Sequence, residues 1–150
     1  MERFDEKLPS LWKKIKTHGI MTLSTCSENR VTSRPMSVVV INGKFYCQTD
    51  ESFLKWQQLQ NNPNCALCVK NISIEGKCRK IGRPIDSENQ FFLKAFKKSF
   101  FGSYIAYSSN SQEILLEITP TLIYLWEYKL TKPYMEYFDF VNFTYRRESM

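Results

Sequence analysis

The sequence predicts a mainly β fold in which an antiparallel sheet is flanked by helices, and it predicts one domain spanning residues 1–150. The strongest indication is the dipeptide Asn42-Gly43, which follows the β-branched run 38–40 and marks a tight hairpin turn. Residues 20–25 alternate apolar and hydroxyl side chains, a pattern typical of a half-buried strand. A chain of 150 residues with 43% hydrophobic side chains is long and apolar enough to form one core.

The first element is an amphipathic helix over residues 3–17, in which apolar side chains recur at helical spacing. These side chains are Phe4, Leu8, Leu11, Trp12 and Ile15. Pro9 lies within the span, so the helix either begins near Ser10 or breaks there. We expect His18-Gly19 to end the helix, since glycine is common just past a helix C-terminus. A strand over 20–25 and a hairpin connection follow.

The centre of the chain consists of a strand over 31–41, the Asn-Gly turn, and a returning strand over 44–48. The second strand feeds directly into a helix, which Thr49 or Asp50 is placed to cap. The dipeptide Asn62-Pro63 ends this helix, because the residue before a proline disfavours helical geometry.

This junction of strand and helix predicts an anion site. Unpaired N–H groups and the helix dipole favour negative charge at a helix N-terminus, and Ser52 and Lys55 would share the adjoining helix face. Arg34 alternates on its strand with apolar residues, among them Met36, and a cation in such surroundings favours an anionic partner. The alternative is an Arg34 that simply reaches water at a strand edge kinked by Pro35.

The second half of the chain continues the antiparallel pattern. A second hairpin is predicted around Asn71, and Gly76 indicates a bulge or a close backbone approach within it. A helix over 90–100 is aromatic around much of its circumference, which predicts burial by both the domain and a partner subunit. Further strands over 113–118 and 119–127 precede a tyrosine-rich tail that is suited to packing across a neighbour.

Composition and residue counts argue against several function classes. Five scattered cysteines without a sign of export indicate reduced thiols, and Cys65 and Cys68 would point to opposite faces of a strand. His18 is the only histidine, so neither a metal site nor Ser-His or Cys-His nucleophilic catalysis is predicted. No apolar run approaches the roughly 18 residues of a membrane span, so we expect a cytoplasmic protein without membrane contact. The net charge of +6 is spread along the chain, which makes nucleic acid an unlikely partner.

A set of spaced positions carries a family resemblance. The positions are Arg34-x-Met36-Ser37-Val38-Val39, Phe45-Tyr46-Cys47-Gln48-Thr49, Lys55, Gln58, Asn62-Pro63 and Ala66-Leu67. Together they resemble the pyridoxamine 5'-phosphate oxidase-like family of FMN-binding split β-barrels, and within it the small general-stress-protein branch. The resemblance extends from about His18 to Trp126. It implies a six-stranded antiparallel split β-barrel that forms a homodimer, with FMN in each of two clefts between the subunits.

The resemblance also implies a set of cofactor-binding residues. Trp126 belongs to it because the family's late strand carries a proline followed six residues later by a tryptophan near the flavin edge, as Pro120 and Trp126 do here. A tryptophan of the core is the alternative for that position. The full set is Arg34, Pro35, Met36, Ser37, Gln48, Thr49, Ser52, Lys55 and Trp126.

The substrate half of the family pattern is missing. The pyridoxamine phosphate oxidases hold the substrate phosphate with a tyrosine, an arginine and a serine on the second helix, where this chain has phenylalanines and lysines. The family's run of the arginine-histidine-aspartate-arginine type after the tryptophan is also absent. Pyridoxamine phosphate is therefore not the expected substrate.

Three functions are compatible with these features, and they are given from the best supported to the least supported. The first is an FMN-dependent oxidoreductase that acts on a small-molecule substrate or electron donor, with no identifiable acid or base residue. The second is a binding protein that keeps FMN or another flat cofactor, such as a deazaflavin or haem, without turnover. The third is a basic, aromatic nucleic-acid binder, for which strong salt dependence and no colour are expected.

Overall fold

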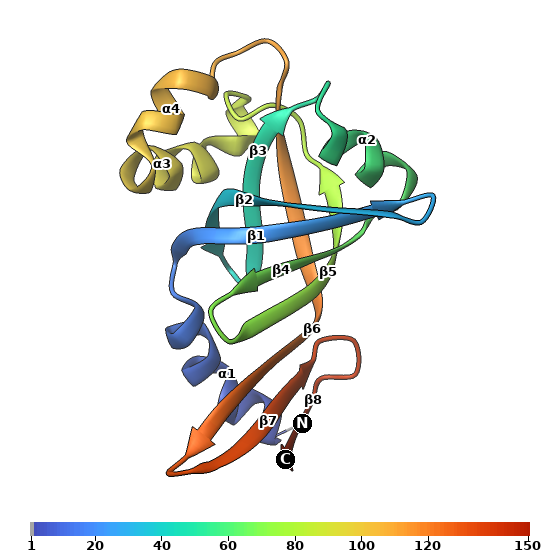
Figure 1. Ribbon diagram of the computed structural model, residues 1–150. Coiled ribbons are helices and arrows are strands. Elements are labelled where there is room, and N and C mark those ends of the chain that lie inside the picture. Colours follow the sequence, from blue (N-terminus) through green and yellow to red (C-terminus); the bar gives the residue numbers. More distant parts are fainter. Residues whose placement is uncertain (1) are drawn as a thin grey trace.

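Six antiparallel strands close into a barrel at the centre of the protein, whose computed structural model describes residues 2–150 (Figure 1). The order around the barrel is β3-β2-β1-β4-β5-β6, and pairing of β3 with β6 closes it. The strands are β1 (His18–Ser27), β2 (Arg30–Ile41), β3 (Lys44–Asp50), β4 (Asn64–Val69), β5 (Ile72–Lys80) and β6 (Glu113–Lys129). The predicted mainly β, six-stranded antiparallel barrel with flanking helices is confirmed.

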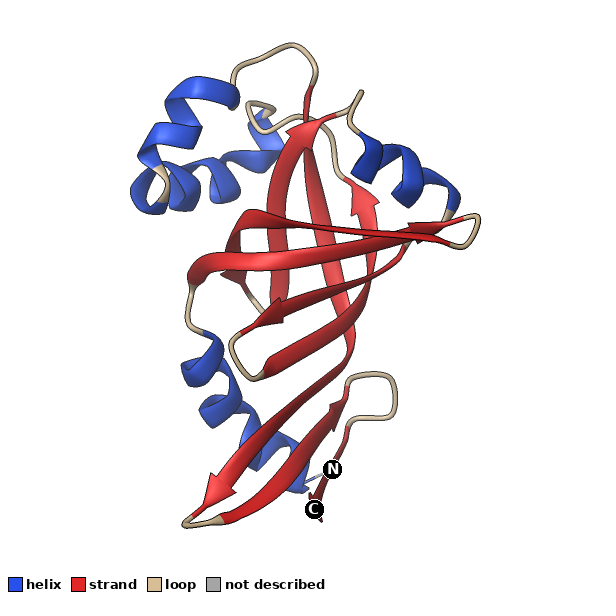
Figure 2. Ribbon diagram, in the orientation of Figure 1, coloured by secondary structure: helices blue, strands red, loops and turns tan. Residues whose placement is uncertain are grey.

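The helices lie on the outside of this barrel (Figure 2). They are α1 (Glu2–Ile15), α2 (Leu54–Asn61), the short 3-10 helix η1 (Ser87–Asn89), α3 (Gln90–Ser99) and α4 (Phe101–Tyr107). In residues 2–150, no helix is long and apolar enough to cross a membrane.

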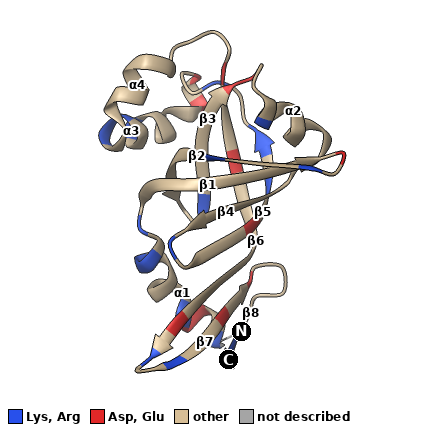
Figure 3. Cartoon of the chain, in the orientation of Figure 1, with Lys and Arg blue, Asp and Glu red and all other residues tan. Residues whose placement is uncertain are grey.

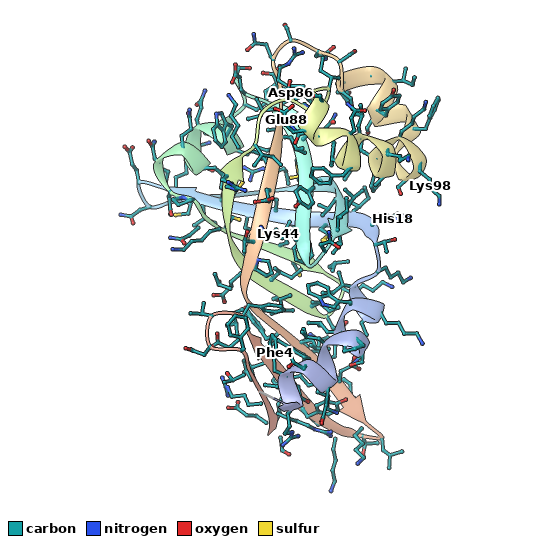
Figure 4. The ribbon with its side chains drawn as sticks, turned by 180° about the vertical axis from the view of Figure 1, so that it is seen from behind. Phe4, His18, Lys44, Asp86, Glu88 and Lys98 are labelled. Atoms are coloured by element: carbon teal, nitrogen blue, oxygen red, sulfur yellow. The ribbon has the colours of Figure 1, made fainter. Side chains whose placement is uncertain are left out.

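Beyond the barrel, the sheet continues into a three-stranded arm. The last part of β6 leaves the barrel and pairs with β7 (Lys132–Asp139), and β7 pairs with β8 (Thr144–Ser149). Helix α1 covers one face of this arm, where Phe4 packs edge-on against Phe138 and Phe140 (Figure 4). The arm lies at the end of the barrel opposite to α2 (Figure 1).

The core has two parts. The barrel interior and the seam under α1 form the larger one, in which Leu23, Val38, Phe45 and Ile118 are fully buried. A smaller cluster lies outside the barrel wall, where Phe92 and Phe96 of α3 pack on Val39, Tyr46 and Leu115. Phe92 and Phe96 are thus buried by the domain itself, whereas Phe91 of the same helix is 41% exposed.

The turns follow the residues that permit left-handed backbone geometry. Asn42 and Gly43 have φ angles of 50° and 75°, as a two-residue hairpin of type I′ requires. Gly76 sits at a register shift of β5, where an added Cβ would lie 2.6 Å from the carbonyl oxygen of Thr119. The predicted hairpin and the predicted close approach at Gly76 are both confirmed.

Helix α1 differs from its prediction at its middle and at its end. It runs without a break through Pro9 and ends at Ile15, and Lys16 supplies the left-handed residue with φ of 70°. His18 and Gly19 instead begin β1. Phe4 before the proline and Leu11 and Ile15 after it are buried on one helix face. This packing outweighs the roughly 3 kcal/mol that a proline costs inside a helix.

Candidate functional site

Arg34 lies on the inner face of β2, at the end of the barrel that α2 covers. It stands opposite Leu23 of β1 and donates through Nη1 to the Leu23 carbonyl oxygen at 3.2 Å and to Thr25 Oγ1 at 2.8 Å. Its Nη2 donates to Thr32 Oγ1. All three acceptors are neutral, and burial lowers the pKa of the guanidinium from its ordinary value. Arg34 therefore does not simply reach water at a strand edge.

Gln58 of α2 fixes the two threonines that hold Arg34. Its Oε1 accepts from the hydroxyls of Thr25 and Thr32, each at 2.6 Å, and its Nε2 donates to the Arg30 carbonyl oxygen at 3.0 Å. Thr25 and Gln58 are almost fully buried, with 1% and 4% of their surface exposed. The network joins β1, β2 and α2, and α2 positions the guanidinium indirectly, through the two threonines.

Lys55 brings a second cation to the same end of the barrel. Its Nζ donates to Thr49 Oγ1 at 3.0 Å and lies 4.9 Å from the centre of the Phe53 ring. Burial lowers the pKa of Lys55 from its ordinary value, and the positive charge of Arg34 lowers it further. Arg34 and Lys55 thus bring two positive charges to the same end of the barrel.

No carboxylate neutralises these two cations directly. Among the described side chains, those of residues 3–150, every ion pair within 4 Å involves other residues. Glu113 and Asp50 lie near Lys55 and favour its charged form, but neither forms an ion pair with it. Two cations hydrogen-bonded to hydroxyl and carbonyl oxygens form a donor set that suits a phosphate.

Ser52 does not lie on the helix face of Lys55. The helix begins only at Leu54, and Ser52 is in the turn before it, where its backbone N–H and its hydroxyl both donate to Asp50 Oδ1, at 2.8 and 2.7 Å. Asp50 therefore closes the turn and does not cap the helix, because Phe53 takes the N-cap position without a side-chain hydrogen bond. The predicted cap and the shared helix face of Ser52 and Lys55 are wrong, although Ser52 stays beside the helix start.

Gln48 and Thr49 point to opposite faces of β3. Thr49 is on the inner face with Lys55, whereas Gln48 is on the outer face, where its Nε2 donates to Glu113 Oε2 at 2.9 Å. Its Oε1 accepts from the hydroxyl of Ser108 at 2.8 Å, which ties the end of α4 to the barrel. The Gln48 side chain is thus not brought together with Arg34 and Lys55.

Glu113 is a buried carboxyl group beside this end of the barrel. Only 6% of its surface is exposed, and burial together with the charge of Asp50 raises its pKa to about 7. The hydrogen bond from Gln48 and the charge of Lys55 act in the opposite direction. Sequence reasoning gave no role to Glu113, which it placed only at the start of a strand.

The remaining predicted residues are divided between the two faces of β2 and the arm. Met36 faces the core beside Arg34, whereas Pro35 and Ser37 face outward. Trp126 is on β6 opposite Met135 of the arm and is 48% exposed, so it is not a core residue. Within one chain, the arm and α2 lie at opposite ends of the barrel, so Trp126 is not brought to Arg34 and Lys55 (Figure 1).

Sequence patterns missed Thr25 and Thr32, and they gave Gln58 no role beyond its place in the family resemblance. A signal was available, because the two threonines are spaced symmetrically about the hairpin at residues 28–29 and therefore face each other. Gln58 also follows Lys55 by three residues, which places both side chains on neighbouring parts of the helix.

The buried cysteines are held as neutral thiols. Burial is the main cause that raises the pKa of Cys47 and of Cys65 to about 12, so both stay protonated and unreactive. Cys65 is buried and Cys68 exposed, which confirms that they point to opposite strand faces. In the described part of the chain, no three His, Cys, Asp or Glu side chains are placed to hold a metal ion.

Comparison with known proteins points to one family. The model of the family described as pyridoxamine 5'-phosphate oxidase matches residues 9–127. A search of curated proteins found no match.

Solved structures of similar fold include three with different described roles. One is General Stress Protein 26 from Bacillus anthracis str. Sterne, with 20% identity, 83% of this chain and 93% of that chain covered, and a TM-score of 0.59. A second is a pyridoxamine 5'-phosphate oxidase-related, FMN binding protein from Nostoc punctiforme, with 13% identity, coverages of 99% and 94%, and a TM-score of 0.58. A third is HutZ, the heme storage protein from Vibrio cholerae, with 10% identity, coverages of 77% and 89%, and a TM-score of 0.62. At these identities, the likeness is one of fold.

Proposed function

Because this chain belongs to the pyridoxamine 5'-phosphate oxidase family, we propose that it is an FMN-binding flavoprotein that works as an oxidoreductase on a small molecule other than pyridoxamine phosphate. One observation carries the proposal: Arg34 and Lys55 converge at one end of the barrel with no carboxylate paired to either among the described residues. A bound phosphate would relieve their mutual repulsion. The FMN-binding relative of similar fold supports a flavin as the ligand.

In this proposal, the chain's own residues bind and orient the cofactor. Arg34 and Lys55 hold the phosphate, and the hydroxyls of Thr49 and Ser52 lie beside it. Gln58 acts indirectly, since it fixes the threonines that position Arg34. When bound, FMN supplies hydride and single-electron chemistry, and the protein supplies binding, orientation and electrostatics.

We further propose a homodimer in which the cofactor lies between the subunits. Trp126 and the end of the barrel that carries Arg34 are far apart within one chain, so Trp126 can serve the cofactor only from a second copy. The outward face of the arm supports this view, because α1 covers only the opposite face. That outward face carries Leu122, Tyr124, Trp126, Tyr128, Met135 and Tyr137.

The phosphate assignment is tested by comparing FMN with riboflavin, which lacks the phosphate. Titrations of wild type, Arg34→Ala and Lys55→Ala with each ligand give the affinities. Each substitution should weaken the binding of FMN by about 1.5–3 kcal/mol, which is the contribution of a hydrogen bond to a charged group. The binding of riboflavin should weaken far less. Lys13→Ala, which removes an exposed cation from α1, is the matched control and should change neither affinity. Equal losses for both ligands would contradict the assignment.

The redox part of the proposal has its own test. A reduced nicotinamide nucleotide, or dithionite, should bleach the visible spectrum of the flavin-loaded protein, and pyridoxamine phosphate should not be oxidised. The likeness to a heme storage protein favours a second candidate, a cofactor-keeping protein without turnover. Two results would favour that candidate. In the first, dithionite bleaches the bound flavin but no physiological donor reduces it. In the second, the purified protein shows a haem spectrum. Efficient conversion of pyridoxamine phosphate would overturn the proposal on substrate.

A further inference from the structure

A groove between α3 and α4 lies apart from the proposed flavin site, on the other side of β3 from α2 (Figure 1). It has a volume of about 510 Å³. Small-molecule sites usually enclose about 300–1,000 Å³ and combine apolar walls with a few polar groups. The groove is lined by Gln90, Phe91, Leu93, Lys94, Lys97 and Tyr104.

The charge of this groove is positive and uncompensated. Residues 90–107 contain three lysines and no acidic residue, and the charges of the helix pair are confined to α3 (Figure 3). Lys94 and Lys97 are three apart on one helix, so they are neighbours of like charge. No ion pair within 4 Å joins either of them to a carboxylate of residues 3–150, whose side chains the structure describes.

The acidic residues just before α3 are engaged in their own loop. Asp86 accepts a hydrogen bond from the backbone N–H of Arg83 at 2.8 Å, and Glu88 accepts from the hydroxyl of Ser87 at 2.7 Å. Both lie at the η1 end of the helix, well away from Lys98 near its other end (Figure 4). Neither carboxylate forms an ion pair within 4 Å with Lys94 or Lys97.

The walls beside these lysines are aromatic and open to solvent. Phe91 is 41% exposed and touches Tyr46 edge-on, with ring centres 5.1 Å apart. The Lys97 ammonium lies 5.4 Å from the centre of the Tyr104 ring, which places a cation directly beside an aromatic surface. No residue of α4 is fully buried, and Tyr104 is half-buried against the cluster formed by Phe92 and Phe96.

We propose that the groove binds a small amphipathic anion, with a flat aromatic or apolar body and one carboxylate, sulfonate or phosphate group. The body covers Phe91, Leu93 and Tyr104, and the anionic group meets Lys94 and Lys97. The apolar body and the anionic group of the ligand both follow from the residues that line the groove. The inference does not depend on flavin binding. The groove gives the protein a second ligand site, distinct from Arg34 and Lys55.

A pair of probes that differ only in charge tests this site. Naphthalene-2-sulfonate and its neutral analogue naphthalene-2-sulfonamide are titrated calorimetrically into wild type, Lys94→Gln, Lys97→Gln and the double variant. Partly exposed ion pairs are weak, so each single change should reduce sulfonate affinity about three- to fivefold and the double change about tenfold. The affinity for sulfonamide should stay the same. Lys98→Gln is the matched control, because Lys98 projects from the same helix but does not line the groove (Figure 4).

Further variants separate this groove from the flavin site and test its apolar wall. Phe91→Ala should weaken sulfonate and sulfonamide alike, whereas Arg34→Ala should leave the binding of both unchanged. Equal affinity of wild type for the two probes, absence of binding, or equal losses in Lys94→Gln and Lys98→Gln would each overturn the proposal. A loss of sulfonate binding in Arg34→Ala alone would place the probe in the flavin site and would also overturn it.

Discussion

Replacing Glu113 by glutamine should change how the stability of this protein depends on pH. Glu113 is buried at the start of β6, and the charged groups that face it are Asp50 and Lys55. Its pKa is raised from an ordinary value of 4.5 to about 7, with burial as the largest cause and the charge of Asp50 as the second. Glutamine keeps an oxygen that can accept from Gln48 but carries no charge.

The sign of the effect follows from proton binding. Between pH 4.5 and 7 the folded protein holds a proton on Glu113 that the unfolded chain has already released. Stability from this proton is therefore fully present below about pH 4.5 and is lost as the pH rises to about 7. One pKa unit corresponds to about 1.4 kcal/mol, which sets an upper value of roughly 3 kcal/mol. The pKa of about 7 already includes the opposing charge of Lys55. Relaxation of the groups around a buried carboxylate lowers its cost further, so we expect about 1–2 kcal/mol.

Urea unfolding of wild type and Glu113→Gln at pH 5 and at pH 8, without ligand, measures the contribution of the Glu113 proton to the free energy of unfolding. The free energy of unfolding of the variant relative to wild type should rise by about 1–2 kcal/mol between the two pH values, because only wild type pays for burying a carboxylate at pH 8. Glu75→Gln, at an exposed position of β5, is the control and should shift far less. A difference between wild type and Glu113→Gln that is the same at both pH values would refute the reasoning.

Three further changes test the packing, the site and the assembly. Gly76→Ala should lower the free energy of unfolding by about 1–3 kcal/mol, because its Cβ would meet the backbone oxygen of Thr119, whereas Gly19→Ala has open space and should be neutral in thermal melts. Gln58→Leu should cost about 1–3 kcal/mol in stability, since it leaves the hydroxyls of Thr25 and Thr32 without their acceptor, and it should weaken FMN less than Arg34→Ala does. Sedimentation over a dilution series should find a dimer at micromolar concentration, with flavin lost as it dissociates; a folded monomer that keeps flavin at nanomolar concentration would contradict the proposed assembly.

Local features of the fold could be predicted from the sequence, because each depends on a few adjacent residues. The Asn42-Gly43 turn and the close approach at Gly76 are of this kind. Closure of the barrel is not, since it pairs residues 45–50 with residues 113–118, more than sixty positions further along. No periodic pattern encodes such a pairing, and only the family resemblance predicted it.

The individual site residues were less predictable, because a spaced motif does not say which face a side chain takes. Gln48 and Thr49 are adjacent on one strand, so the twofold alternation of a strand sends them to opposite faces. Only Thr49 faces Lys55, whereas Gln48 contacts Glu113 and Ser108. Applying the alternation rule to the motif would have separated them.

The position of the candidate anion site follows from the point at which the inner face of the barrel becomes polar. Along β2, towards the hairpin at residues 28–29, the inward residues change from Val38 and Met36 to Arg34 and then Thr32. The partner strand β1 changes in parallel, with Thr25 facing Thr32. Polar side chains on an inward face need partners, and α2 supplies them by placing Gln58 over the two threonines. The same helix carries Lys55, so the element that closes this end of the barrel also brings the second cation to Arg34.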